Sequence, residues 1–99
     1  MAKKPRLYFS INVVDLLDIG MEDGMFGDSE TLEREFGGNF VLPVGTYCLF
    51  DEIDGVVGNI NYRDYDNSVT MEIKIENKKF HSMMFASLKD PKNGWKPRR

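Results

Sequence analysis

Residues 68–76 alternate between polar and apolar side chains, and this pattern restricts the fold more than any other feature of the chain. Val69, Met71, Ile73 and Ile75 occupy every second position. Successive side chains of a strand point to opposite faces, so a period of two predicts a β-strand. One face of this strand is apolar and the other is polar, which is typical of an antiparallel sheet with one solvated side. We therefore expect this strand to belong to an antiparallel meander.

Similar patterns predict further strands before and after it. Leu7, Phe9 and Ile11 alternate with polar residues in the first of these segments. The connections between the later segments are short and rich in Asp, Asn and Gly, which favour tight turns. The additional predicted strands span residues 6–14, 45–51, 55–63 and 79–88.

One short helix is predicted over residues 29–36. Ser29 or Asp28 can accept a hydrogen bond from the first turn, and Gly37 can end the helix. Leu32 and Phe36 lie four positions apart and would share one face. The preceding segment, 15–28, contains three glycines and is expected to form a helical turn at 15–19 followed by a loop. The predicted fold class is α+β, an antiparallel meander of four to five strands that can curl into a small barrel.

The length of 99 residues allows a single domain. We assign the α+β domain to residues 1–88. Residues 89–99 contain Pro91, Gly94 and Pro97 together with five cations, so we expect a basic, flexible C-terminal tail.

Charge is strongly segregated along the chain. The net charge is −3, but residues 11–54 carry eleven carboxylates against Arg34 as the one cation. Such a block creates a negative field that can steer a positively charged partner toward the protein. The simpler interpretation is a solvated acidic face that keeps the protein soluble.

Few chemistries that enzymes use are available to this chain. Cys48 and His81 are the single cysteine and histidine, and neither lies in a nucleophile motif. The glycines do not match the spacing of a phosphate-binding loop. The carboxylates do not match the spacing of a calcium loop, so we expect no metal site, no cofactor and no enzymatic activity.

The compartment is predicted from the N-terminus and the lone thiol. The apolar stretch after Arg6 is interrupted by polar residues, lacks a cleavage site and is too short to span a bilayer. A lone thiol at Cys48 suits a reducing interior. We expect a cytoplasmic protein with no membrane contact.

Our leading hypothesis is a non-enzymatic protein-interaction module that presents its acidic segment to a basic site on a partner protein. It would act as a viral-type inhibitor that mimics the charge of nucleic acid. Carboxylates would make the charge contacts and two apolar side chains would anchor the centre. The predicted contact residues are Asp15, Asp18, Glu22, Asp23, Met25, Phe26, Glu30, Glu33 and Glu35.

Two alternatives remain open. A small β-barrel could bind single-stranded nucleic acid through the basic tail, with Trp95 stacking on a base and, as further stacking candidates, Tyr47, Tyr62, Tyr65 and Phe85. The tail residues of this alternative are Lys89, Lys92, Trp95, Lys96, Arg98 and Arg99. A small ligand or nucleotide could instead bind at a homodimer interface, because the adjacent Met83 and Met84 would make both faces of a strand at 79–88 apolar.

Overall fold

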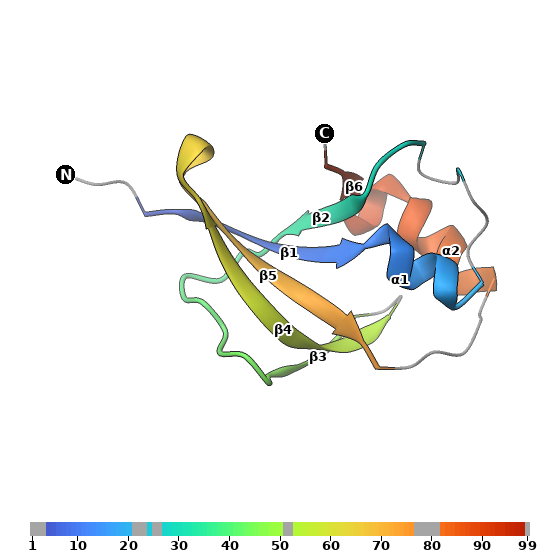
Figure 1. The fold of residues 1–99 in the computed structure, drawn as a ribbon, viewed down its shortest axis with the longest axis horizontal. Helices are drawn as coiled ribbons and strands as arrows, with labels where there is room; N and C mark the ends of the chain where they lie inside the picture. The colour runs from blue at the N-terminus through green and yellow to red at the C-terminus, as the bar shows by residue number, and fades with distance from the viewer. Residues whose placement is uncertain (1–3, 21–23, 25–26, 51–52, 77–81, 99) are drawn as a thin grey trace.

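A computed structural model of the chain describes residues 4–20, 24, 27–50, 53–76 and 82–98, except for the side chains of 82–85. Six strands, two α-helices and two 3-10 turns follow one another within these residues (Figure 1). In chain order they are β1 (Arg6–Asn12), α1 (Val13–Asp18), β2 (Thr31–Glu35), β3 (Tyr47–Leu49), β4 (Asp54–Arg63), η1 (Asp64–Asp66), β5 (Ser68–Ile75), α2 (Ser82–Lys89), η2 (Pro91–Asn93) and β6 (Lys96–Pro97).

All six strands form one sheet with the order β3-β4-β5-β1-β2-β6. Neighbouring strands are antiparallel except β1 and β5, which run parallel with Leu7 opposite Val69 and Phe9 opposite Met71. The α+β class is confirmed. The pure meander and the closed barrel are wrong, because β1 enters the sheet between β5 and β2 and the sheet stays open. A parallel pair needs a long crossover, and residues 13–67 supply it.

The longest pairing joins β4 and β5, and it brings their backbones unusually close at one position. The register shifts between Val57 and Asn59, which marks a β-bulge. A Cβ added at Gly55 would overlap the carbonyl oxygen of Lys74 on β5. Glycine is therefore required there for the two strands to approach each other.

One face of the sheet carries the core. Ile11 on β1 and Met71 and Ile73 on β5 are buried, as the alternation of their strands predicts. Leu16 of α1 and Leu88 of α2 belong to the same buried cluster. Figure 1 shows both helices at the end of the sheet where β1 and β5 finish. They therefore cover the apolar side at that end.

The opposite face is polar. Register places Tyr8 of β1 beside Thr70 of β5 and Glu35 of β2, all on this face. At the far end of β4, Arg63 lies opposite Ser68 and joins the same side. The ion pairs and the larger hollow considered below are found on this face.

The helix predicted at 29–36 is wrong, because residues 31–35 form the strand β2. Leu32 and Phe36 are four residues apart, and this even spacing puts them on one face of a strand as well as one face of a helix. Pairing with β1 decides between the two, with Ile11 opposite Leu32 and Phe9 opposite Arg34. The strand buries Leu32 completely and leaves Glu35 exposed.

The strand predicted at 79–88 is also wrong where the structure describes it, because Ser82–Lys89 is the helix α2. Residues 79–81 lie outside the described residues. Adjacent apolar residues are a poor fit to a strand with one buried face, but they are readily accommodated by a helix. The hypothesis of a dimer through two apolar faces of this strand therefore loses its basis.

Residues 89–98, for which the composition predicts a basic tail, contain a turn, a buried tryptophan and a short strand. Asp90 caps the turn η2 by accepting a hydrogen bond from the Lys92 amide at 3.0 Å. Trp95 is only 3% exposed. β6 pairs antiparallel with β2, with Lys96 opposite Glu33. Burial of the large Trp95 indole holds this segment against the core, although the composition of its other residues is typical of an unstructured chain.

Candidate functional site

The predicted contact carboxylates are divided between two places on the molecule. Asp15 and Asp18 of α1 line a hollow of about 250 Å³ together with Ile19, Lys74, Ile75 and Glu76. Glu33 and Glu35 of β2 line a different pocket, described below. The remaining predicted contacts, Glu22, Asp23, Met25 and Phe26, lie outside the described residues.

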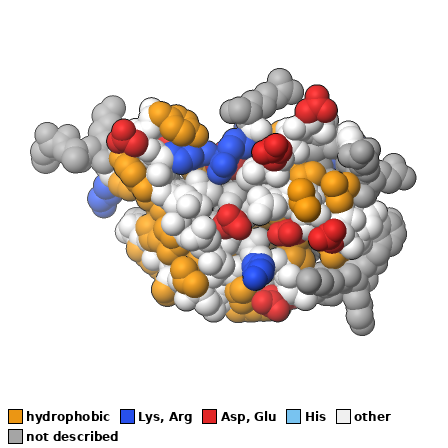
Figure 2. Space-filling model, in the orientation of Figure 1, with side chains coloured by type: hydrophobic (Ala, Val, Ile, Leu, Met, Phe, Trp, Pro, Cys, Tyr) orange, Lys and Arg blue, Asp and Glu red, His pale blue; other side chains and the backbone are white. Residues whose placement is uncertain are grey.

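Glu30 belongs with α1. Its carbonyl oxygen accepts a hydrogen bond of 2.9 Å from the Val13 amide, which places it next to the first turn of the helix. We call Asp15, Asp18, Glu30 and Glu76 the acidic end. None of the ion pairs formed among the described residues involves these four carboxylates. Figure 2 shows carboxylates spread across the visible face of the molecule.

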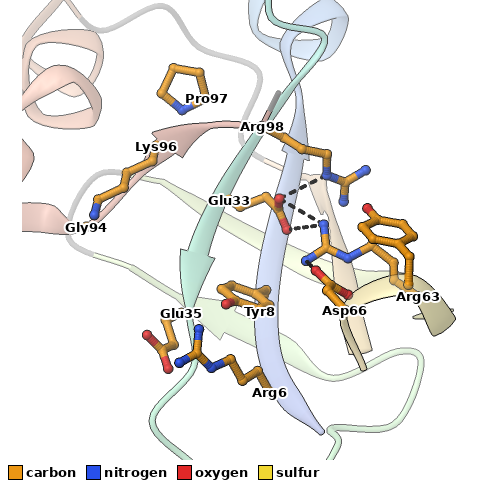
Figure 3. A pocket seen from close by; sticks show the side chains of 11 residues that line it. Arg6, Tyr8, Glu33, Glu35, Arg63, Asp66, Gly94, Lys96, Pro97 and Arg98 are labelled. Atoms are coloured by element: carbon orange, nitrogen blue, oxygen red, sulfur yellow. Dashed lines mark hydrogen bonds and ion pairs between the residues drawn. The ribbon is translucent and has the colours of Figure 1, made fainter. Parts of the chain in front are cut away.

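The second place is a pocket of about 470 Å³ on the polar face of the sheet, at the end opposite α1. Figure 3 shows its side chains rising from β1, β2 and the ends of β4 and β6. We call it the arginine pocket. It is lined by Arg6, Tyr8, Glu33, Glu35, Arg63, Tyr65, Asp66, Gly94, Lys96, Pro97 and Arg98.

Arg63 forms the floor of the arginine pocket. Its Nε donates to Ser68 Oγ at 2.7 Å and its NH1 donates to Glu33 Oε1 at 2.9 Å. NH2 lies 3.1 Å from a carboxylate oxygen of Asp66. The Arg63 side chain is only 12% exposed. Every guanidinium nitrogen of Arg63 is therefore engaged within the protein.

Two tyrosine rings flank the same guanidinium. The Arg63 Cζ lies 5.3 Å from the ring centre of Tyr8 and 5.8 Å from that of Tyr65. Cation–π contacts of this kind fix the ring and the cation relative to each other. Burial lowers the pKa of Arg63, but hydrogen bonding to Glu33 and the nearby negative charges outweigh it, so the pKa lies above the ordinary value. The cation is permanent.

Glu33 joins the C-terminal segment to this floor. Its Oε1 accepts a second hydrogen bond of 3.0 Å from Arg98 Nε. Its Oε2 lies 2.9 Å from Arg63 NH1 but outside hydrogen-bond geometry, and it is buried. One carboxylate thus holds two arginines from distant parts of the chain, and it lines the pocket without being free to bind a cationic partner.

Arg6 and Glu35 form the outer rim. Hydrogen bonding to Tyr8, followed by the charges of Tyr8 and Glu35, raises the pKa of Arg6 above its ordinary value. In Figure 3 the Arg6 and Glu35 side chains lie together below Tyr8, and Arg98 lies on the other side of that ring. Tyr8 therefore stands between two guanidinium groups.

The tail residues that the nucleic-acid alternative proposes lie in different places in the structure. Trp95 is in the core, with its ring centre 5.4 Å from that of Phe50. Lys96 and Arg98 line the arginine pocket, whereas Lys89 and Lys92 are exposed and do not. Arg99 lies outside the described residues.

Sequence analysis missed Arg6, Tyr8, Arg63 and Asp66, which are four of the eleven residues that line the arginine pocket. A signal for the first two was present, because Arg6 and Tyr8 occupy the polar positions of an alternating strand. No pattern in the sequence indicates that the ends of β4 and β6 meet β1 and β2. Tyr65 was a stacking candidate, and the structure places it in the pocket.

Other chemistry is sparse among the residues that the structure describes. They contain no group of three or more His, Cys, Asp or Glu side chains that could hold a metal ion. Burial raises the pKa of the Cys48 thiol, which keeps it protonated and weakly nucleophilic. No helix in the described part of the chain is both long and apolar enough to cross a membrane.

Comparison with protein-family models, with curated proteins and with solved structures found no match.

Proposed function

We propose that this protein is a non-enzymatic interaction module whose acidic end binds a basic site on another protein. The observation that carries the proposal is the hollow beside α1. Asp15, Asp18 and Glu76 line it with Lys74 as the one cation among its lining residues. Carboxylates that line one hollow make its field negative, and such a field attracts an incoming cation.

The hollow suits a lysine or arginine side chain. Its lining combines two buried apolar residues, Ile19 and Ile75, with the carboxylates. Lysine and arginine bury their aliphatic stems on apolar surface while keeping the charged head among polar groups. A lining of apolar and carboxylate side chains offers contacts to both parts of such a side chain.

The proposed contacts are Asp15, Asp18 and Glu30, together with Glu76. Glu33 and Glu35 are not retained, because the first is bound to two arginines and the second lies beside Arg6. Glu22, Asp23, Met25 and Phe26 stay predictions. Since nucleic-acid-binding grooves are basic, an inhibitor that occupies such a groove remains our proposal for the biological role.

The test uses a short peptide rich in lysine and arginine as the probe. The double variant Asp15→Asn with Asp18→Asn should weaken peptide binding about tenfold, since close interfacial charge pairs contribute about 1.5 kcal/mol or more. Calorimetric titration at two salt concentrations should also show a smaller salt dependence for the variant.

The matched control is Asp28→Asn with Asp64→Asn, which changes two exposed carboxylates outside the acidic end and produces the same net charge. This control should bind the peptide nearly as well as the natural protein. An equal loss in both double variants would mean that net charge alone attracts the peptide, and the proposal would be rejected.

A further inference from the structure

We propose that the arginine pocket binds a nucleoside phosphate, with the base stacked on Tyr65 and phosphate oxygens held by Arg6 and Arg98. This site shares no residue with the acidic end and is independent of the function proposed above.

The first support is the supply of uncommitted positive charge. Each of the three guanidinium nitrogens of Arg63 already contacts Ser68, Glu33 or Asp66, so its charge is compensated within the protein. Arg98 uses only Nε for Glu33, so its two terminal nitrogens have no partner among the described residues. Arginine donors in a planar pair match phosphate oxygens closely.

The second support is the distribution of that charge around the pocket. Arg6 and Arg98 lie on opposite sides of Tyr8 (Figure 3), and Lys96 also lines the pocket. Glu33 and Asp66 are already neutralised by arginine. The carboxylate that remains unneutralised by an ion pair is Glu35 at the outer rim, next to Arg6. The pocket therefore attracts anions although the whole chain has a net charge of −3.

The third support is an aromatic ring with open surface. Tyr65 is 80% exposed, although its ring also contacts the Arg63 guanidinium. An exposed ring held by a cation–π contact offers a preformed stacking surface, and stacking of one base contributes about 1–3 kcal/mol. Simple anions do not use such a surface. The combination of ring and guanidinium thus favours a nucleotide over an acidic peptide.

The experiment titrates the full chain with a short oligouridylate, with uridine monophosphate, with inorganic phosphate and with a poly-glutamate peptide. The oligonucleotide should bind more tightly than phosphate or poly-glutamate. Equal binding of the mononucleotide would identify a free nucleotide as the ligand, and preference for the oligonucleotide would identify a single strand. Either result supports a nucleoside phosphate site.

Two variants test the proposed contacts. Tyr65→Leu should weaken oligonucleotide binding about tenfold, because it keeps apolar bulk and removes the stacking ring. Arg6→Gln should lower the salt dependence by about 0.7 in the slope of log K against log salt, the value for one phosphate contact on a single strand. Both substitutions alter exposed side chains, so the fold should persist.

The matched controls are Tyr62→Leu and Lys92→Gln, at exposed residues that do not line the pocket. They should leave oligonucleotide binding within about twofold. The proposal is overturned if poly-glutamate binds as tightly as the oligonucleotide, if no nucleotide binds at low salt, or if the control variants lose as much affinity as the pocket variants.

Discussion

At the scale of single residues, the Glu33 carboxylate joins β2 to two arginines from distant parts of the chain. It sits on β2, accepts from Arg63 at the end of β4 and from Arg98 after β6. Its side chain is 14% exposed, so these contacts are weakly screened by water. Removing one partner of a buried ionic group leaves the other charges uncompensated, which costs more than the net contribution of the pair.

The variant Glu33→Gln should therefore lower the free energy of unfolding by about 2 kcal/mol, since an amide keeps the shape and one acceptor but loses the charge. Urea denaturation followed by circular dichroism measures this change. The control Glu30→Gln alters an exposed carboxylate and should stay within about 0.5 kcal/mol of the natural protein. Similar losses in the two variants would show that Glu33 is an ordinary surface residue.

At the scale of elements, the sequence predicted those strands whose pairing is local. β4 and β5 form a hairpin through η1, and their predicted ranges, 55–63 and 68–76, nearly match the observed ones. The alternating side chains of these two segments indicate a hairpin, because the residues between the segments favour a tight turn. β1 was also found, but its parallel partner was not, since parallel pairing leaves no local signal.

The elements that sequence reasoning mistook are those decided by tertiary contacts. In β2, the spacing of Leu32 and Phe36 fits both a strand and a helix, and only the neighbouring β1 resolves it. The C-terminal segment looked mobile because proline, glycine and lysine surround its one tryptophan. The arginine pocket could not be predicted either, because tertiary contacts assemble it from four separate parts of the chain.

The C-terminal segment provides the prediction for this scale. Trp95→Ala should lower the free energy of unfolding by about 3–5 kcal/mol, because the indole is buried against Phe50 and its removal leaves a cavity. Chemical denaturation followed by circular dichroism measures the loss. Lys92→Ala in the same segment should be nearly neutral, because this side chain is exposed. A flexible tail would instead make both variants neutral.

At the scale of the whole molecule, the parallel pairing of β1 and β5 separates the two proposed sites. Arg6 begins β1 and α1 follows its last residue, while Ser68 begins β5 and Glu76 follows its end. Since β1 has seven residues, the arginine pocket and the acidic end lie roughly 20 Å apart. This distance exceeds the Debye length of about 8 Å at physiological salt, so each end should then act independently.

Salt should therefore control whether the acidic end opposes nucleotide binding at the arginine pocket. At 10 mM salt the Debye length is about 30 Å, so Asp15→Asn with Asp18→Asn should strengthen binding of a short oligouridylate. The gain should be about twofold if each removed charge contributes about 0.2 kcal/mol. At 150 mM salt the same variant should bind like the natural protein. Fluorescence anisotropy with a labelled oligonucleotide measures both constants. Equal strengthening at the two salt concentrations would show that the strand touches Asp15 or Asp18 directly. The separation of the two sites along β1 would then fail to explain how one small domain serves both proposed ligands.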